Sequence, residues 1–330
     1  MTFSATLVWF GVLQTILYLL FIRVIDLYER EPLRYVVPVF VWGFAVATTI
    51  SIVFNTLASV TFEAVAGRQV ANFLTAVFVA PVVEETTKGL ALLIIFFIAY
   101  VASRRRGLVE FSGVMDGIVY GSAVGFGFAL AEDILYGVQY GAETFLVRRI
   151  LGGFAHAAFT SLTGIGIGLI PFVHNKMLKV VPPLLGLLGA ILLHGTFNFL
   201  ASTLGAVAYL FMFVVVLLYL TVIIAWLVYE KRTIRAELRE EVETGFISQE
   251  EYAILPTFFR RTGYYMRLIF TGRLGEWSRS RAIHSTSVDL AFAKRLARRA
   301  PTPSRVERVR ALRQKIVDLR SAGRAPQTSY

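Results

Sequence analysis

Seven apolar runs recur along the chain and are separated by short polar segments. They cover about residues 4–24, 36–58, 72–100, 113–139, 151–172, 181–201 and 205–228. Each is near or above the ~20 residues that an α-helix needs to cross the hydrocarbon of a bilayer. The pattern predicts an all-α, polytopic bundle of about seven transmembrane helices, or eight if a re-entrant segment lies within 59–83.

After residue 228 the long apolar runs end and charged residues become frequent. This pattern predicts a small tail of short amphipathic helices. Ser248 and Glu251 have the spacing of a capping box. A charged helix near the C-terminus carries an apolar stripe formed by Val309, Leu312, Ile316 and Leu319. We expect this stripe to pack against the helix at 288–299. Segment 258–270 mixes aromatic residues with arginines, as interfacial helices do. We therefore expect two domains, a transmembrane domain at 1–228 and a tail at 229–330.

Composition agrees with a bilayer environment. Hydrophobic residues make up 56% of the chain and charged residues 17%, which is typical of multi-spanning membrane proteins and not of soluble domains. Cysteine is absent, which excludes disulfide scaffolds, thiol nucleophiles and cysteine metal sites. The first apolar run has no basic region before it and no cleavage pattern, so we expect a retained span and not a cleaved signal.

The positive charge is concentrated in the tail. The net charge is +11, and from residue 230 onward there are 21 Lys and Arg against 11 Asp and Glu. Beside a membrane, such a tail is expected to face anionic lipid and not nucleic acid.

Loop charges predict the orientation of the spans through the positive-inside rule. One side holds the basic tail together with Arg23, Arg30, Arg34, Arg104 to Arg106, Lys176 and Lys179. The other side holds only Arg68, Arg148 and Arg149. We expect the N-terminus outside and the C-terminal tail in the cytoplasm.

Three charged residues interrupt the third apolar run, at Glu84, Glu85 and Lys88. Apolar residues flank them on both sides, so a small shift of the helix ends cannot bring the carboxylates to water. A charge at that depth costs roughly 2 to 3 kcal/mol or more, which marks an intramembrane carboxylate as a functional site by default. Glu84 and Lys88 have the i, i+4 spacing of an ion pair, so we expect Lys88 to neutralise Glu84 and to leave Glu85 less satisfied.

Polar residues in three later runs fall at the same depth as this cluster. With the assigned orientation, Glu132, His156 and His194 lie in the outer half of their spans at about 1.5 Å per residue, as Glu84 does. This agreement predicts one buried polar pocket shared by four helices. Asn198 lies four residues after His194 on the same helical face, so its amide and the imidazole could address the same atom.

Small residues predict how the fourth span packs. Gly117, Gly121 and Gly125 form consecutive small-xxx-small steps, and Glu132 follows seven residues later on the same face. Such faces pack closely against another helix, so Glu132 should face protein and not lipid. We expect the adjacent Asp133 to have a structural role.

Four short motifs occur in order, namely EETTK at 84–88, FALAED at 128–133, His156 in the next run and HGTFN at 194–198. Together they resemble the motifs of PrsW-type intramembrane proteases, which belong to a wider group with CAAX prenyl endopeptidases and bacteriocin-processing proteins. The segment DLYEREP at 26–32 is also similar to that family. The resemblance covers about residues 1–228 and does not extend to the tail.

The resemblance implies hydrolysis of a peptide bond in a membrane-anchored protein, for example an anti-sigma factor, at a bacterial cell (inner) membrane. The matching catalytic positions are Glu84, Glu85, Glu132, His156 and His194, with Asn198 as a polar helper.

Two mechanisms remain open for these residues. In one, His156, His194 and Glu132 hold Zn²⁺, and one of the two adjacent glutamates takes the proton of a water molecule. In the other no metal is needed, because a glutamate and a histidine activate the water and Asn198 stabilises the oxyanion. The absence of an HExxH spacing favours the second mechanism slightly, so zinc is a candidate cofactor only.

Two other functional classes fit the same polar residues. An ion- or proton-coupled transporter also places acids and histidines inside the membrane, although the two halves of the chain show no internal repeat. A non-catalytic immunity or scaffold protein could keep the same fold. Outside the spans, His174 and His284 are expected to be solvated surface residues, and Gly164, Gly166 and Gly168 to serve helix packing.

Overall fold

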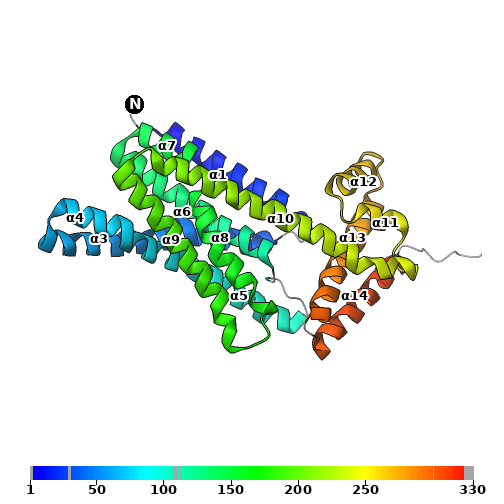
Figure 1. Cartoon of the computed structure of the whole chain (residues 1–330). Helices are drawn as coiled ribbons and strands as arrows, with labels where there is room; N and C mark the ends of the chain where they lie inside the picture. The colour runs from blue at the N-terminus through cyan, green and yellow to red at the C-terminus, as the bar shows by residue number, and fades with distance from the viewer. Residues whose placement is uncertain (1–2, 29–30, 107–110, 112, 300, 323–330) are drawn as a thin grey trace, which may run out of the picture. The chain divides into compact units, whose positions relative to one another are not determined.

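The computed structural model describes residues 3–28, 31–106, 111, 113–299 and 301–322, with the backbone alone for 103–106. All regular elements in this part are helices (Figure 1). In chain order they are α1 (Ala5–Ile25), α2 (Leu33–Val41), η1 (Trp42–Ala47), α3 (Thr48–Ala66), α4 (Arg68–Leu74), η2 (Thr75–Val79), α5 (Ala80–Arg106), α6 (Val114–Tyr140), α7 (Ala142–Leu151), α8 (Ala155–Gly168), η3 (Ile170–Phe172), η4 (Met177–Val180), α9 (Val181–Leu204), α10 (Val207–Glu243), α11 (Gln249–Ile254), α12 (Phe258–Phe270), α13 (Leu274–Arg299) and α14 (Pro303–Ser321). The predicted all-α class is confirmed.

Six helical segments in the described part are long and apolar enough to cross a membrane. They are Ala5–Ile25, Leu33–Ala66, Val114–Tyr140, Ala155–Phe172, Met177–Leu204 and Val207–Glu243. They correspond to six of the seven predicted spans, and the helical membrane bundle is confirmed. The remaining predicted span, 72–100, lies within the helical run α4–η2–α5, which carries Glu84, Glu85 and Lys88 and is not one of the six.

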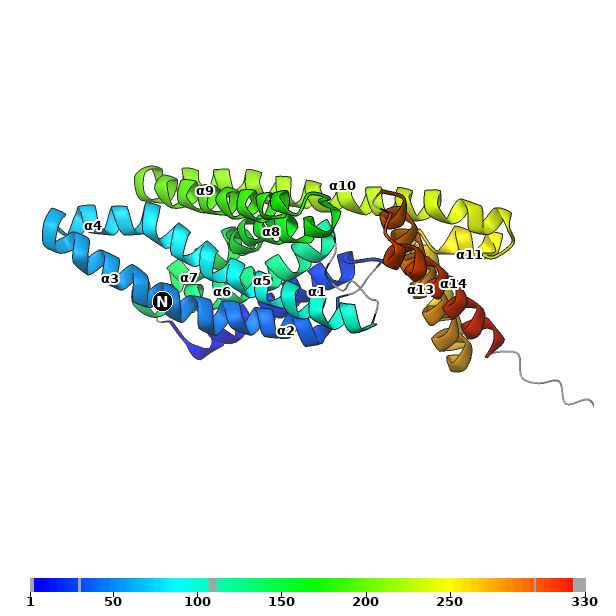
Figure 2. The ribbon, with the colours of Figure 1, turned by 90° about the horizontal axis from the view of Figure 1, so that it is seen from below.

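Several boundaries differ from the prediction. The second span does not end near residue 58, because α3 continues to Ala66 and turns back into α4 at Gly67, whose φ of +78° suits glycine. The two helices lie side by side (Figures 1 and 2). The fifth span begins at Ala155 and not at residue 151, because the short helix α7 precedes it. Arg30 and the side chains of Arg104–Arg106, which support the predicted orientation, lie outside the described part.

The chain divides into two compact units, one formed by residues 1–26 and 31–223 and the other by residues 27–30 and 224–330. Helix α6 is the centre of the first unit, since all of its residues from Val114 to Ala131 are buried. On one side it meets α8, where a Cβ added to Gly117 would lie 2.3 Å from the backbone of Gly164 and one added to Gly121 would lie 2.6 Å from Ser161. The predicted small-residue packing is confirmed.

A π-helical turn, η2, precedes the charged motif of α5. Pro81 has no N–H, so the carbonyl of Val77 cannot receive the usual i→i−4 hydrogen bond, and such a gap permits a local π turn. The carbonyl of Val77 faces α9, where a Cβ at Gly195 would lie 3.1 Å from it. The turn therefore lies against the helix that carries His194.

The second unit is a separate helical assembly. Ser248 and Glu251 form the predicted capping box at the start of α11. The predicted stripe on α14 packs against α13, since Leu312 and Ile316 share a buried cluster with Val288 and Ala291. Both of these sequence predictions are confirmed.

The prediction that His284 is a solvated surface residue is wrong. It is buried in α13, its ring stacks on Tyr265 with centroids 5.6 Å apart, and its Nδ1 lies 3.0 Å from the Tyr265 hydroxyl. Burial lowers the pKa of His284 to about 4, because a protonated imidazole would lose its hydration there; Glu251 opposes this shift and Arg261 adds to it. The stacking partner lies 19 residues away in the chain, which helical periodicity cannot detect.

Candidate functional site

Four helices of the first unit bring the intramembrane polar residues together. Helix α5 supplies Glu84, Glu85 and Lys88, α6 supplies Glu132, α8 supplies His156 and α9 supplies His194. Glu85 and Lys88 are fully buried, and Glu84, His156 and His194 are at most 7% exposed. The structure therefore brings together all the predicted site residues except Asn198.

Glu85 is the most completely satisfied carboxylate of the cluster. Its Oε1 lies 2.8 Å from Nζ of Lys88 and 3.0 Å from Nδ1 of His194. Its Oε2 accepts a hydrogen bond of 3.0 Å from Thr160. Buried charges persist only when paired and hydrogen-bonded, and Glu85 meets both conditions.

The expectation that Lys88 neutralises Glu84 and leaves Glu85 unsatisfied is wrong. Nζ of Lys88 lies 3.7 Å from Glu84, farther than from Glu85. Glu84 accepts a hydrogen bond of 3.3 Å from Asn55 at Oε1, whereas its buried Oε2 has no hydrogen-bond partner in the described part of the chain. Both spacings, i+3 and i+4, bring a carboxylate within reach of one lysine, so the neighbouring helices decide which one is paired.

Both ring nitrogens of His156 are occupied. Nδ1 lies 3.0 Å from Nζ of Lys88, and Nε2 lies 2.8 Å from Oε2 of Glu132. An ammonium group can only donate, so Nδ1 accepts and Nε2–H donates to the carboxylate. This arrangement fixes a neutral imidazole, whose ring also packs against Phe128 with centroids 5.1 Å apart.

His194 is held at one nitrogen only. Its ring stacks on Phe159, and Nδ1 faces the Glu85 carboxylate, to which it can donate. Nε2 then carries a lone pair, and it lies 3.8 Å from the unpartnered Oε2 of Glu84. Glu84 and His194 thus present two available electron-pair donors to the same point.

A network of arginines supports Glu132 from α7. Arg148 donates to Glu132 at 2.6 Å and to Asp133 at 2.7 Å. Arg149 is 1% exposed and donates to Asp133 at 3.2 Å and to Thr15 at 2.7 Å. The structural role expected for Asp133 agrees with these contacts.

Sequence reasoning missed Asn55, Thr160, Arg148 and Arg149 as neighbours of the cluster. Thr160 is four residues after His156, so the i+4 rule could have placed it on the same helical face. Arg148 and Arg149 were interpreted as loop charges; because α7 folds back onto α6, they contact acids 15 and 16 residues away. Asn55 had no signal beyond being polar within an apolar run.

The structure places Asn198 outside the hydrogen-bonded cluster. Its Nδ2 donates a 2.8 Å hydrogen bond to the carbonyl of Ala76, within the π turn η2. In the described part of the chain this contact connects α9 to the segment before Glu84. The geometry favours a positioning role for Asn198.

One set of side chains in the described part could hold a metal ion. Glu84, His156 and His194 each offer a ligand atom, and these atoms lie within 4.8 Å of one another. The set differs from the expected one, since Glu84 takes the place of Glu132. His156 would have to exchange its contact with Lys88 or with Glu132 for the ion. One glutamate and two histidines form a donor set that catalytic zinc sites use.

The charges of the cluster leave room for a cation. The four acids Glu84, Glu85, Glu132 and Asp133 face the three bases Lys88, Arg148 and Arg149. The excess carboxylate is Glu84, whose Oε2 lies 3.7 Å from Nζ of Lys88 and has no hydrogen-bond partner among the described residues. The residues therefore fit a bound cation, with Lys88 as the nearest competing positive charge.

Comparison with known proteins gives the family. Residues 31–225, which include every member of the cluster, match the model of the PrsW family intramembrane metalloproteases. The chain belongs to the PrsW family. The helices of the cluster thus lie within the part of the chain that the family model matches, and the segment after residue 225 lies outside it.

Three relatives of this family are similar to parts of the chain, each with the name Protease PrsW. The relative from Shouchella clausii is 37% identical over 36% of this chain and 51% of its own length, and that from Geobacillus kaustophilus is 32% identical over 46% and 60%. The relative from Bacillus subtilis is 29% identical over 54% and 75%. The chain thus matches between half and two thirds of the first two relatives' length. No solved structure is significantly similar to the chain.

Proposed function

We propose that this protein is an intramembrane endopeptidase that hydrolyses a peptide bond of a membrane-anchored protein. The observation that carries the proposal is the meeting of Glu84 and His194 beside Glu85, Lys88 and His156, within the helices that the PrsW family model matches. Buried acids and histidines facing one point are the groups that water activation requires.

Glu84 is the proposed general base. Its Oε2 is buried without a hydrogen-bond partner among the described residues, so it can accept the proton of a water molecule and return it to the leaving amine. Glu85 is fully engaged with Lys88, His194 and Thr160, and its proposed role is to hold the lysine and the imidazole in place. This assignment distinguishes the two glutamates and is the reverse of the sequence expectation, which paired Glu84 with Lys88.

His194 and His156 have different proposed roles. Nε2 of His194 faces Glu84 and can hydrogen-bond the attacking water or the substrate carbonyl. His156 is oriented by Lys88 on one side and by Glu132 on the other, and Arg148 fixes Glu132 in turn. Asn198 is proposed to position the helix before Glu84 through Ala76.

The family description implies a metal, and Glu84, His156 and His194 are the residues that would hold it. Glu84 would then be a ligand and not the general base, and His156 would exchange its contact with Lys88 or with Glu132 for the ion. The chemistry that such an ion supplies when bound is Lewis-acid activation of a carbonyl oxygen or a water molecule. Whether or not an ion is present, Glu85 orients His194.

The proposed setting is a bacterial cell membrane, with the N-terminus outside and the tail in the cytoplasm. A membrane-anchored substrate follows from the family and from the depth of the cluster. An anti-sigma factor is the substrate class that the resemblance of the motifs implies.

The test uses the full chain in nanodiscs with a single-span model substrate. Glu84→Gln and His194→Ala should each lower the cleavage rate at least about 100-fold, since general acid–base catalysis contributes about 10²–10⁴-fold. Glu63→Gln is the matched control, because it makes the same change at an exposed position of α3 and should cleave at the wild-type rate.

Cleavage at the wild-type rate by folded Glu84→Gln and His194→Ala proteins would contradict the proposal. Uptake of an ion into proteoliposomes that is lost in Glu84→Gln, with no proteolysis by the wild type, would instead favour the transporter interpretation. Measuring the cleavage rate of the wild type with a chelator, and again after zinc is added back, tests whether the reaction needs a metal.

A further inference from the structure

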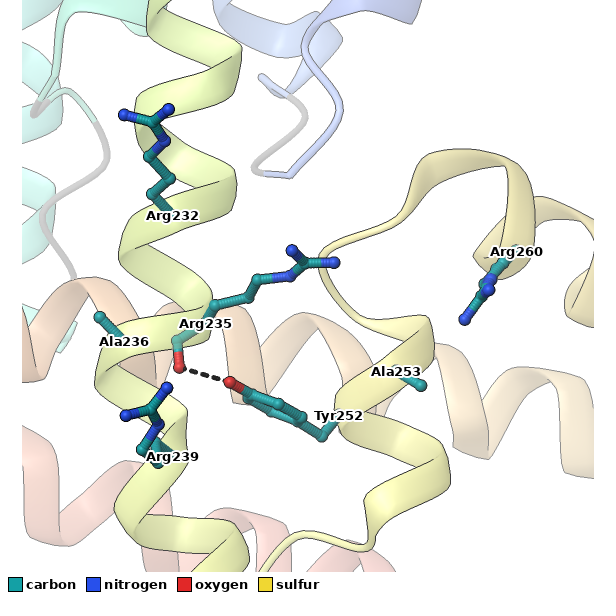
Figure 3. A pocket seen from close by; sticks show the side chains of 7 residues that line it. All are labelled: Arg232, Arg235, Ala236, Arg239, Tyr252, Ala253 and Arg260. Atoms are coloured by element: carbon teal, nitrogen blue, oxygen red, sulfur yellow. Dashed lines mark hydrogen bonds between the residues drawn. The ribbon is translucent and has the colours of Figure 1, made fainter.

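Four arginines surround a pocket in the second unit that the family match does not cover. The pocket has a volume of about 660 Å³ and is lined by Arg232, Arg235 and Arg239 of α10, Tyr252 of α11 and Arg260 of α12. In Figure 3 the side chain of Arg235 extends from α10 toward α12, and that of Arg260 extends from α12 toward α10. The family model ends at residue 225, so nothing in it assigns this pocket a role.

The backbone around the pocket is fixed by specific contacts. The hydroxyl of Tyr252 donates a 2.8 Å hydrogen bond to the carbonyl of Arg235, which holds α11 against α10 (Figure 3). The capping box of Ser248 and Glu251 defines where α11 begins. Arg232, Arg235 and Arg239 follow at i, i+3 and i+7, a spacing that places all three on one face of the helix.

Three of the five acids of α10 pair with bases that do not line this pocket, and a fourth, Glu230, accepts a hydrogen bond from Trp226. Glu237, Glu240 and Glu241 of α10 pair with bases of α13 and α14, namely Lys294, Arg295, Arg298 and Arg313. Glu251, the acid nearest in sequence to Tyr252, pairs with Arg320. Of the ion pairs between described residues, none includes a pocket arginine. The pocket therefore gathers four arginines that take part in no ion pair within the described part of the chain.

The place of the pocket along α10 corresponds to the phosphate layer of a bilayer. The apolar part of the helix ends near Val228, and Trp226 stacks with Tyr229 at 4.7 Å, as in the aromatic belt of a membrane interface. Arg232 follows Val228 by four residues, about 6 Å of helix, and the headgroup region is about 5–7 Å thick on each side. Arg232 thus stands at the depth of the lipid phosphates, and Arg235 and Arg239 follow about 4.5 and 10.5 Å farther along the helix.

Helix α12 adds an exposed apolar ridge beside the pocket. Phe259 is 84% exposed and Phe270 is 80% exposed, with Met266 between them on the same face. Arg260 and Arg267 flank this ridge, a distribution typical of a helix lying in the membrane interface. The start of α12 is held by Arg261, which donates to the carbonyl of Leu27, two residues after the end of α1.

We propose that the arginine pocket binds a phosphate group, and that its position favours the headgroup of an anionic phospholipid over a soluble phosphate. Guanidinium groups recognise phosphate through paired N–H donors, and several of them can share one phosphate. The bound lipid would anchor the second unit to the bilayer surface next to the end of α10.

The test measures lipid binding by native mass spectrometry of the full chain in detergent. The probes are phosphatidylglycerol, phosphatidylcholine and inorganic phosphate. The pocket variant Arg235→Gln/Arg239→Gln/Arg260→Gln should retain at least five-fold less phosphatidylglycerol than the wild type. The matched control Arg273→Gln/Arg279→Gln/Arg310→Gln removes the same charge from exposed positions of the second unit and should change retention less than two-fold.

The outcomes separate the possible sources of the phosphate. Displacement of phosphatidylglycerol by millimolar inorganic phosphate, without loss in the control variant, supports the site and assigns it to soluble phosphates. Equal retention by the wild type and the pocket variant, or equal loss in both triple variants, overturns the proposal.

A second measurement remains informative if the triple variant does not fold. The chain has no cysteine, so Ala253→Cys places a single fluorescent label in the pocket and Ser304→Cys places one away from it. In nanodiscs, replacing part of the phosphatidylcholine by phosphatidylglycerol should shift the emission at position 253 and leave that at position 304 unchanged. No shift at position 253 contradicts the proposal.

Discussion

At the scale of the residue, Lys88 is the cation that pairs with the buried Glu85 of the candidate site. It contacts Glu85 at 2.8 Å, His156 at 3.0 Å and the ring of Phe128 at 3.7 Å from its centroid. Removing one partner of a buried ion pair leaves an uncompensated charge, whereas removing both can be nearly neutral. This asymmetry provides a test of the pairing.

Lys88→Met should lower the free energy of unfolding by about 3–5 kcal/mol, because the Glu85 carboxylate is then left without its cation. The double variant Lys88→Met/Glu85→Gln should recover a large part of that loss. The measurement is denaturant unfolding in detergent micelles with a chelator present, so that a metal does not replace the lysine. A double variant at least as unstable as Lys88→Met would contradict the pairing.

At the scale of the element, glycines set the distance between α6 and α8, and this distance brings Glu132 to His156. A Cβ at Gly121 would meet Cα of Ser161 at 2.6 Å, and one at Gly125 would meet the carbonyl of His156 at 2.5 Å. Both neighbours are backbone atoms, so they cannot move aside as a flexible side chain can. The close approach of the two helices therefore depends on these positions.

Gly121→Ala should separate α6 from α8 and destabilise the folded protein, with loss of the monodisperse species in size-exclusion chromatography. Gly263→Ala is the matched control, because a Cβ there meets nothing within 4 Å and α12 should gain up to about 1 kcal/mol of helix propensity. Unchanged stability of both variants would show that the two helices can separate without cost.

The helical periodicity of the sequence explains which elements were predicted well. The stripe of α14 and the glycine face of α6 were found because both follow a spacing within one helix. The π turn η2 and the fold-back of α7 were not found. Both depend on contacts with other helices, as the proximity of the carbonyl of Val77 to Gly195 and of Arg148 to Asp133 illustrates.

At the scale of the whole molecule, the prediction concerns the sides of the membrane on which the loops lie. The loop charges place the junction between α9 and α10 outside and the tail inside. The absence of cysteine makes single-cysteine labelling straightforward. Ala206 in that junction and Ser321 at the end of α14 are both exposed.

In intact cells, a membrane-impermeant maleimide should label Ala206→Cys and should label Ser321→Cys only after lysis. The reverse pattern would invert the topology and place the cluster in the inner half of the bilayer. Labelling of both positions in intact cells would show that the tail is not cytoplasmic.

The sequence by itself determined the membrane bundle and the family resemblance, and it predicted that the polar residues meet at one depth. Each of these follows from spacing along single helices: apolar runs long enough to span a bilayer, and Glu84, Glu132, His156 and His194 at similar depths. Only the tertiary structure decided the partners within the cluster. Lys88 reaches both glutamates along α5, and the hydrogen bonds of Glu85 to Thr160 on α8 and His194 on α9 select Glu85 and leave Oε2 of Glu84 without a hydrogen bond in the described part of the chain.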